Sequence, residues 1–542
     1  MRLYPRGTSG KINAACNLPL RQLTLYVDVL PWRNPMLTKT IALAGVYGLM
    51  SVATAQAGLT ISNRPTHNVT CSAGSCAATK ATANLNISEL VAMLSTSDVS
   101  VSAVAKAFYM DIVNPVSWSS PHGLSLDARN AISIVQPLVS EGGGALHLWP
   151  SSDAGGSSPQ FSGKGKIAFW DLNSTFTVGH TPYTLVGSIQ TLASDVQSNP
   201  SGHYALANDY DAAADGVYQA APISTSFTGV FAGNANTIRD LTIQGPDNNA
   251  ALGLFACECG SAGDLRFLKL KVRGKADSTV GGLAAKLDGV VYDVIVSGSV
   301  TAGPNSSVGG LIGAIQGAGV LVTSRVSGAV TGTGTDTTGS SAVGGLIGTV
   351  PESTSGPAYS SSSAKVTGGV GWRAGGLIGS NKGDTYSVFA TGTVSVGDNG
   401  FAGGLIGESQ HGNVFGGDVH DTYATGFTVG GVNSTVGGLI GHNQGSVGTS
   451  YSTGAVASGS GNAVGGLIGN DSGASDLTNT YWDTTTSGQS HGVGNDTAYP
   501  GVTGLTTEQF QAGLPAGFQP PFWAESADIN NGFPYLPSWP PN

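Results

Sequence analysis

Charged side chains, aromatic side chains and cysteine are all scarce in this sequence. Of its 542 residues, 10% are Asp, Glu, Lys or Arg, 7% are aromatic and five are cysteine. The scarcity of long helix-forming side chains excludes a helical bundle. The 82 glycines follow no Gly-X-Y period, which excludes collagen. What is abundant is Gly, Ser, Thr and Val, with 40% hydrophobic residues, and this mixture predicts an all-β chain with many turns.

The few charges are unevenly divided along the chain. Residues 1–57 carry six Lys or Arg and one acid, so the remainder has 17 basic and 32 acidic residues, a net charge of −15. A surface of that sign repels phosphate backbones and anionic lipid. Nucleic-acid binding is therefore not expected.

Residues 36–57 have the pattern of a signal peptide. Lys39 ends a short basic region, 41–52 is mostly apolar and uncharged, and Ala55-Gln56-Ala57 fits a cleavage site before Gly58. The apolar run is short for a membrane span. Residues 1–35 fit either an extended basic region or a start placed too early. The pattern predicts a protein that is secreted or displayed on the outer cell surface.

Four cysteines follow this leader. Cys71 and Cys76 predict a small disulfide-closed loop in an oxidising compartment. Cys257 and Cys259 lie on one face of a predicted strand, slightly far apart for an unstrained bridge, so a disulfide and free thiols both stay open. Their spacing and surroundings do not predict a metal site.

The strongest signal is an internal repeat. Val-Gly-Gly-Leu-Ile-Gly, or its Ala-Gly-Gly variant, occurs six times, and 280–284 is a shortened seventh copy. A Thr-, Tyr- and Val-rich run follows most copies, and the intervening turns vary in length. Constant strands joined by variable loops predict stacked coils of a β-solenoid. The repeated leucines are Leu283, Leu311, Leu346, Leu377, Leu405, Leu439 and Leu467.

Adjacent residues of a regular strand face opposite sides, so Leu and the Ile after it are expected to point in opposite directions. The Leu position varies less than its neighbour among the copies. We therefore expect the leucines to form the core, and the glycines to lie at corners or at close approaches of neighbouring coils.

These repeats, with their trailing Tyr-Ser-Thr-Gly, resemble the GLUG motif of filamentous-haemagglutinin-like bacterial adhesins. The resemblance is specific over 280–487 and extends, more loosely, to segments such as 124–130 and 530–536. It implies a right-handed parallel β-helix with terminal caps and a role in attachment. One departure is that no Asn-Pro-Asn-Leu secretion motif is present, which puts in doubt the outer-membrane secretion partner that the family often uses.

The predicted organisation has five parts. A leader occupies 1–57, an N-terminal cap 58–115, and coils that precede the repeats 116–220. The repeat β-helix occupies 221–487, and a Pro- and aromatic-rich C-terminal cap occupies 488–542. The stretch 86–94 is expected to be helical. The C-terminal aromatics are expected to fold over the last coil, with an aromatic carbohydrate site as the alternative.

Catalytic signatures are weak in this chain. Gly488-Gln489-Ser490-His491-Gly492 matches Gly-x-Ser-x-Gly but lacks the strand-turn-helix context of a hydrolase elbow. His420-Asp421 has no nearby candidate nucleophile. Asp209, Asp211 and Asp215 are a weak candidate for a calcium site. The alternative interpretation is that they form an exposed acidic turn with no bound metal. No catalytic residue and no cofactor is predicted.

The leading hypothesis is a non-enzymatic, secreted or surface-displayed adhesin-like protein that attaches to cells, glycans, matrix or other surfaces. A β-helix lyase or glycosidase acting on polysaccharide is the first alternative, because carboxylates on a strand face need not be close in sequence. A cleft with converging carboxylates and a basic residue would favour that enzyme, and a smooth surface would favour adhesion. A structural extracellular spacer is the second alternative.

Overall fold

The computed structural model describes residues 58–150, 158–352, 354–411, 417–461, 463–472, 476–494 and 499–541. The predicted leader, including its signal peptide at 36–57, lies outside these residues. No helix in the described ranges is long and apolar enough to cross a membrane.

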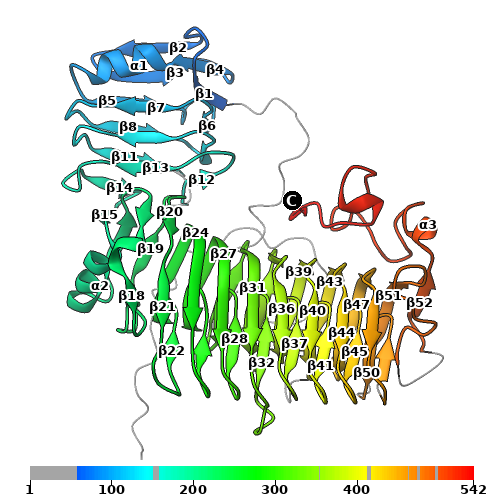
Figure 1. Ribbon diagram of the computed structural model, residues 1–542. Coiled ribbons are helices and arrows are strands. Elements are labelled where there is room, and N and C mark those ends of the chain that lie inside the picture. The colour runs from blue at the N-terminus through cyan, green and yellow to red at the C-terminus, as the bar shows by residue number, and fades with distance from the viewer. Residues whose placement is uncertain are drawn as a thin grey trace, which may run out of the picture. The chain divides into compact units, whose positions relative to one another are not determined.

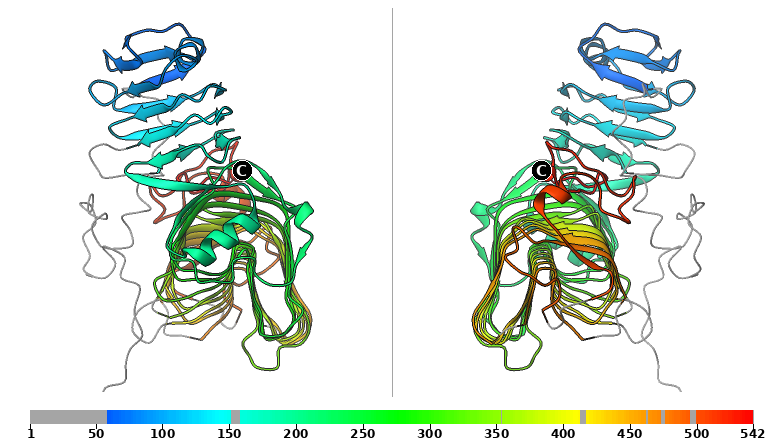
Figure 2. Two further views of the ribbon diagram at one scale, coloured as in Figure 1. Left: turned by 90° about the vertical axis from the view of Figure 1, so that its left-hand side faces the viewer. Right: turned by 90° about the vertical axis from the view of Figure 1, so that its right-hand side faces the viewer.

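Nearly all strands pair in parallel with the equivalent strand of the next coil. Ile378, for example, pairs with Ile406, Ile406 with Ile440, and Ile440 with Ile468. Successive coils therefore stack in register (Figure 1), and in the views along the repeat region they superimpose on a common outline (Figure 2). The chain is an all-β parallel β-helix, which confirms the predicted fold class.

The first coils form three short columns of strands around one hydrophobic core. The first column contains β1 (Gly58–Ser62), β4 (Ala83–Asn86), β6 (Tyr109–Ile112), β9 (Ala131–Ile134) and β12 (Gln160–Phe161). The second contains β7 (Val116–Trp118), β10 (Leu138–Ser140) and β13 (Ile167–Phe169). The third contains β2 (Val69–Ser72), β3 (Ser75–Ala78), β5 (Val99–Ser102), β8 (Leu124–Asp127), β11 (Leu146–Trp149) and β14 (Phe176–Val178), and β15 (Thr181–Val186) leads on from it.

The later coils surround a second, longer core. Two eight-stranded parallel sheets carry the repeated motif. The first sheet contains β22 (Ala251–Leu252), β25 (Thr279–Val280), β28 (Ser307–Gly309), β32 (Ala342–Gly344), β37 (Arg373–Gly375), β41 (Phe401–Gly403), β45 (Thr435–Gly437) and β49 (Ala463–Gly465). The second contains β23 (Phe255–Glu258), β26 (Ala284–Leu287), β29 (Ile312–Ile315), β33 (Ile347–Val350), β38 (Ile378–Asn381), β42 (Ile406–Ser409), β46 (Ile440–Asn443) and β50 (Ile468–Asp471).

The remaining strands of these coils form a broad face, here called the broad sheet. Its earlier strands are β16 (His203–Leu206), β17 (Tyr210–Asp211), β18 (Val217–Tyr218), β19 (Val230–Ala232), β20 (Thr237–Arg239), β21 (Thr242–Gln244), β24 (Ser261–Arg273), β27 (Val290–Ala302), β30 (Val320–Val322) and β31 (Arg325–Gly332). Its later strands are β34 (Ser355–Ala358), β35 (Ser361–Ser362), β36 (Lys365–Gly368), β39 (Asp384–Ala390), β40 (Val394–Val396), β43 (Val419–Ala424), β44 (Thr428–Gly430), β47 (Val447–Ser452), β48 (Val456–Ser458), β51 (Leu477–Asp483) and β52 (Val502–Leu505).

The repeated leucines lie at a corner of each coil. Leu311, for example, follows the end of β28 and precedes β29. All seven leucines are fully buried, as expected. The isoleucines that follow them, such as Ile312 and Ile378, are also fully buried, so the expectation that the two residues face opposite sides was wrong. It assumed a continuous strand, whereas the chain bends at the leucine and turns both side chains inward.

The glycines of the motif are required by this bend. A Cβ at Gly375 would lie 1.9 Å from the carbonyl oxygen of Ile378 and 2.7 Å from the backbone nitrogen of Gly407 in the next coil. Both neighbours are backbone atoms that hold the sheets together, so they cannot move aside as a flexible side chain would. Gly344 and Gly403 are equally close to the corresponding backbone atoms.

The N-terminal region is coiled earlier than the sequence suggested. Parallel pairing begins at β1, which pairs with β4 and β6, and not near Val116. α1 (Ile87–Leu94) is the expected helix, and Asn86 caps it by accepting from the backbone N–H of Ser88 at 2.9 Å. α2 (Ile189–Ser198), capped by Ser188, was not predicted. Its buried residues Ile189, Leu192 and Val196 have helical spacing after the Ser188 cap, so the sequence carried a helix signal, but only over 10 residues.

The cysteines of the described chain form two disulfides. Cys71 and Cys76 lie opposite each other in the β2–β3 hairpin and are bonded, with Cα atoms 4.1 Å apart, as predicted. Cys257 and Cys259 are also bonded, with Cα atoms 5.8 Å apart. The sequence had left that second pair open.

The C-terminal region only partly covers the last coil. β52 pairs with β51 and continues the stack. Beyond it, α3 (Thr507–Phe510), a short 3-10 helix η4 (Asn530–Gly532) and their loops turn back along the outside of the broad sheet. The 507–541 segment, called the tail below, reaches back as far as Arg325, whose guanidinium donates to the Pro540 carbonyl at 3.0 Å.

A charge in the leucine column is expected to break the stack locally. Leu377→Asp places an unpaired carboxylate among buried apolar side chains, and we expect a loss of about 3–5 kcal/mol in the free energy of unfolding. Val432→Asp, at a site that is 43% exposed, is the matched control and is expected to change it by about 0.5 kcal/mol or less. Urea denaturation and hydrogen exchange at the corners measure both, and equal effects of the two substitutions would contradict a buried corner.

Candidate functional site

One outward-facing column of residues on the broad sheet changes from polar to aromatic side chains along the stack. Strand register aligns one residue from each coil, and backbone pairing places each beside the next. The second half of the column is aromatic and the first half is polar except for one isoleucine. In chain order the residues are Arg266, Ile295, Arg325, Ser361, Phe389, Tyr423, Tyr451 and Tyr481.

The aromatic half of the column anchors the tail. The Phe389 and Tyr423 rings stack with centroids 4.7 Å apart, and the Tyr423 and Tyr451 rings with centroids 5.2 Å apart. Trp523 packs against both tyrosines, and its Nε1 donates to Asp421 Oδ1 at 2.8 Å. Tail residues Phe510, Phe518, Phe533 and Leu536 complete this buried cluster. Most of the tail aromatics therefore face the sheet and are not open to a carbohydrate.

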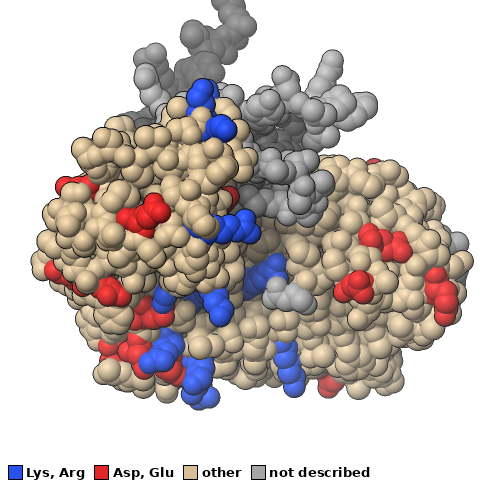
Figure 3. Space-filling model, turned by 90° about the horizontal axis from the view of Figure 1, so that it is seen from above, with Lys and Arg blue, Asp and Glu red and all other residues tan. Residues whose placement is uncertain are grey.

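The tail ends where the column becomes polar, and a cleft lies there. The Trp539 ring lies 4.1 Å from the guanidinium carbon of Arg325, and Trp539 Nε1 donates to Ser361 Oγ at 3.2 Å. The cleft has a volume of about 780 Å³. Lys and Arg side chains lie in and beside the hollow on this face (Figure 3). Residues that line the cleft include Arg266, Asp293, Arg325, Ser361, Asn530 and Trp539.

Two carboxyl groups meet beside this cleft, and one of them, Asp293, is among its lining residues. Asp264 on β24 and Asp293 on β27 occupy equivalent places in adjacent coils, and both have left-handed backbone conformations, with φ of 53° and 47°. Their side chains hydrogen-bond to each other. Burial raises the pKa of both, and the neighbouring Asp293 raises the pKa of Asp264 further. Arg266 lowers the pKa of both, but its effect is smaller than that of burial.

This pair can share one proton between two carboxyl oxygens. Such a pair donates a hydrogen bond or transfers a proton, with Arg266 and Arg325 positioned to favour the charged form. Direct contact places the two carboxyls closer together than the roughly 5–5.5 Å of retaining glycosidases and the wider gap of inverting ones. The pair therefore does not have the geometry of either standard glycosidase mechanism.

A second cluster of charges lies on the β38–β42–β46 face. Arg373 Nε donates to Glu408 Oε2, and Asp336 lies 3.8 Å from the same guanidinium. His442 Nδ1 is 3.5 Å from Glu408 Oε1, and His442 Nε2 is 2.7 Å from Ser472 Oγ. This order of serine, histidine and carboxylate resembles a hydrolase triad, but His442 Nδ1 makes no hydrogen bond to the carboxylate. The Glu408 carboxylate is also bound to Arg373, and Ser472 lies on the exposed surface away from the cleft, so we interpret the cluster as a stabilising network.

The three aspartates suggested for calcium do not converge. Lys166 pairs with Asp209 at 2.7 Å and Arg239 pairs with Asp211 at 2.7 Å. Asp215 instead accepts from Tyr210 and Tyr218, at 2.5 and 2.7 Å. The short 3-10 helix η3 (Ala212–Asp215) separates the carboxylates and turns them towards different partners. Within the described ranges, no group of three or more His, Cys, Asp or Glu side chains has a metal-binding arrangement.

The other sequence candidates are likewise dispersed. His420 is exposed, and Asp421 accepts from Thr449 and Trp523 as part of the tail anchor. The Gly488–Gly492 stretch lies in a loop after β51 and lacks the strand-turn-helix of a nucleophile elbow. Sequence reasoning missed Asp264 and Asp293, whereas Trp539 belongs to the C-terminal aromatics for which a carbohydrate site was the alternative. The two aspartates are one coil apart, and only the register, which was not known for these irregular coils, brings them together.

Comparison with known proteins gives a distant likeness. No protein-family model matches the chain, and no curated protein matches it. A solved structure of a proposed immunoglobulin A1 protease from Bacteroides ovatus is similar at 18% identity and a TM-score of 0.37, over 66% of this chain and 92% of that one. At this distance the likeness assigns no activity to the chain.

The Glu408 network is expected to make stability depend on acid pH. Burial, the largest influence, raises the pKa of Glu408, but His442, Arg373 and Gln410 together lower it from 4.5 to about 2. A depressed pKa stabilises the fold above the unfolded value of 4.5, and this contribution disappears as the pH falls towards 2. Glu408→Gln should lower the free energy of unfolding by about 1–3 kcal/mol at pH 7, and by less as the pH falls. Urea denaturation of the wild type and of Glu408→Gln at pH values between 7 and 2 measures this difference in stability.

The exposed Glu141 supplies a control for this experiment. Glu141→Gln removes the same charge without breaking an ion pair of the network, and it should leave the acid dependence unchanged. A constant difference between wild type and Glu408→Gln at every pH would contradict the proposed linkage.

Proposed function

We propose that the protein is an exported attachment protein, similar to filamentous-haemagglutinin-like adhesins, that binds a glycan in the cleft beside Trp539 without cleaving it. The cleft has the carboxylates and basic residues expected of an enzyme, but the direct Asp264–Asp293 contact does not match the spacing of a glycosidase, so the attachment proposal rests on the cleft as a binding site. Its volume of about 780 Å³ falls within the range of roughly 300–1,000 Å³ that is typical of ligand sites. It also combines an aromatic ring, amides, hydroxyls and charged groups.

These groups suit a sugar. Asn530 and Asn531 supply amides, and Ser361, Ser362 and Ser363 supply hydroxyls from the sheet. Amides and hydroxyls both donate and accept hydrogen bonds, as sugar hydroxyls do. An indole ring such as that of Trp539 offers a flat apolar face and one polar edge. Together they make a site that holds a polar, ring-shaped ligand.

The rigid β-helix is suited to presenting the cleft to an external partner. The cleft stands on strands whose backbones are hydrogen-bonded to the coils on either side, so its wall is preorganised. A rigid stack that carries such a wall fits a role in contact with a neighbouring cell, a surface glycan or matrix. Secretion through the predicted signal peptide would place it there.

Removing Trp539 should weaken glycan binding. Trp539→Ala takes away the ring and its contacts to Arg325 and Ser361, and we expect about 5–10-fold weaker binding in calorimetry with a glycan identified on an array. Trp170→Ala is the control, because Trp170 is 68% exposed and does not line the cleft. Equal affinities for wild type and Trp539→Ala would overturn the assignment of the site.

A polysaccharide-cleaving β-helix enzyme other than a standard glycosidase, such as a lyase, is the second candidate, and the Asp264–Asp293 pair beside two arginines favours it. If the pair transfers protons, the wild type should depolymerise a polysaccharide, and Asp293→Asn should reduce the rate by about 100-fold or more. Reducing-end release measures this. Turnover that Asp293→Asn abolishes would replace the attachment proposal, and binding without turnover would exclude this enzyme.

A further inference from the structure

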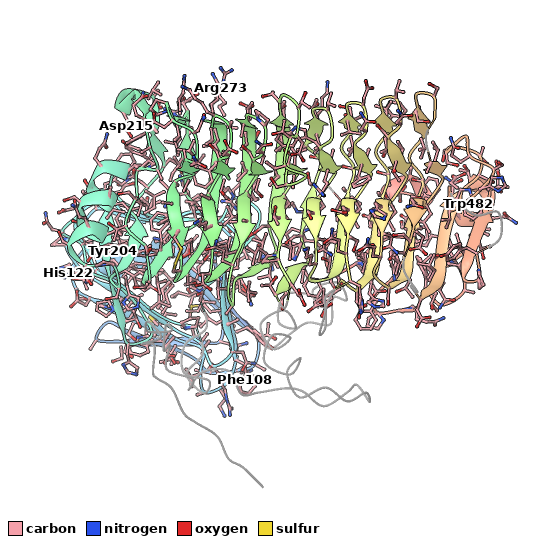
Figure 4. All side chains as sticks on the ribbon, turned by 90° about the horizontal axis from the view of Figure 1, so that it is seen from below. Phe108, His122, Tyr204, Asp215, Arg273 and Trp482 are labelled. Carbon is pink, nitrogen blue, oxygen red and sulfur yellow. A yellow bond between two sulfur atoms is a disulfide. The ribbon has the colours of Figure 1, made fainter. Side chains whose placement is uncertain are left out.

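Strand β24 carries a row of cations in a chain that has few. Arg266, Lys269, Lys271 and Arg273 lie on this strand, and Lys275 follows it; we call these five residues the basic strip. All except Arg266 are exposed, and the Arg273 side chain points away from the ribbon (Figure 4). A straight strand from Arg266 to Arg273 would extend roughly 23 Å, and the left-handed backbone at Lys269, where the register with β27 shifts, bends and shortens it. The strip therefore covers the length of several sugar rings.

Arg266 lies beside the Asp264–Asp293 pair, but Lys271 and Arg273 have no acidic residue paired with them on the neighbouring strands. Within the described residues, no ion pair involves Lys271, Arg273 or Lys275. Lys269 lies near Asp211, which already pairs with Arg239. None of the residues paired with Arg266, Lys271 and Arg273 on the two adjacent strands is acidic. They are Thr237, Thr242, Gln244, Ile295, Ser299 and Thr301.

Several acids of the same coils are buried. Burial raises the pKa of Glu258 to about 8, and it raises that of Asp264 well above its usual value. Both side chains therefore carry less negative charge at neutral pH than the sequence suggests. Because salt screens charges beyond about 8 Å, a ligand at the strip experiences this local excess of cations more than the net charge of the chain.

The strip is continuous with the cleft. Arg266 belongs to both, and strand register places Arg325 two strands away from it, roughly 10 Å along the sheet. Figure 3 shows basic side chains in and beside the hollow. Between the cations lie hydroxyl side chains such as Ser299, Thr301 and Ser327, so the surface alternates charge with hydrogen-bonding groups.

We propose that the ligand of the cleft is an acidic glycan, whose carboxylate or sulfate groups bind the basic strip and Arg325 while its hydroxyls bind the Ser and Thr side chains between them. This inference rests on the proposed function and names its ligand class. Guanidinium groups suit carboxylate and sulfate because they bind both oxygens of such a group at once.

The test uses the full chain and four probes: polygalacturonate, dextran sulfate, neutral dextran and duplex DNA. The double variant Lys271→Gln/Arg273→Gln lies outside the cleft and should bind the acidic glycans about tenfold more weakly. Lys80→Gln/Lys106→Gln removes the same charge from exposed sites outside the strip and should bind them as the wild type does. Wild-type affinity for the acidic glycans should fall with added salt.

The outcomes separate the two proposals. Binding of either acidic polymer, weakened only in the strip variant, supports the inference, and the preferred polymer identifies carboxylate or sulfate as the recognised group. Equal binding of dextran and the acidic polymers, unaffected in the strip variant but weakened by Trp539→Ala, would overturn it and leave glycan attachment standing. Tighter binding of DNA than of any glycan would overturn the inference. Binding of no glycan at all would overturn the proposed function as well.

Discussion

The backbone hydrogen bonds between successive leucine corners hold the repeat region in register. The N–H of Leu346 donates to Leu377 at 2.9 Å, and the N–H groups of Leu377 and Leu405 donate to the next leucine at 2.8 Å. These hydrogen bonds require each corner to lie directly over the next. Glycine is therefore needed at the positions where a Cβ would overlap backbone atoms. Once the corners are aligned, all other strands of the coil are aligned too. The functional surface depends on this, because its residues are neighbours only through register.

The sequence predicts the fold well because the motif that identifies it is also the element that aligns it. Six near-copies predict stacked coils without any knowledge of the loops between them. The orientation of Ile312 and its equivalents could not be predicted, because a strand and a tight corner have the same sequence pattern there. The early start of coiling at Gly58 was missed for a related reason: β1, β4 and β6 pair in parallel but share no motif.

The site was much less predictable than the fold. Arg266, Arg325 and Ser361 meet because each occupies the same place in its coil, yet the coils around them have irregular lengths and the motif does not extend to this column. The change from Ser361 to Phe389 divides the contacts of the tail: the stacked rings bury most of its apolar side chains, and the polar positions before them bind only its end, through Trp539 and Pro540. The cleft is thus a consequence of where the aromatic column begins.

The net charge of the chain does not exclude a positively charged surface on one strand, and the reason is geometric. A β-helix spreads one chain over a long surface, so charges far apart along the stack are screened from each other, while those on one strand act together. The chain's acids are scattered or buried, as Glu258 and Asp264 are, whereas Lys271 and Arg273 project from one strand with hydroxyl and amide neighbours. A negative net charge is therefore compatible with a positively charged site. We expect the net charge to act mainly by repelling polyanions from the rest of the surface.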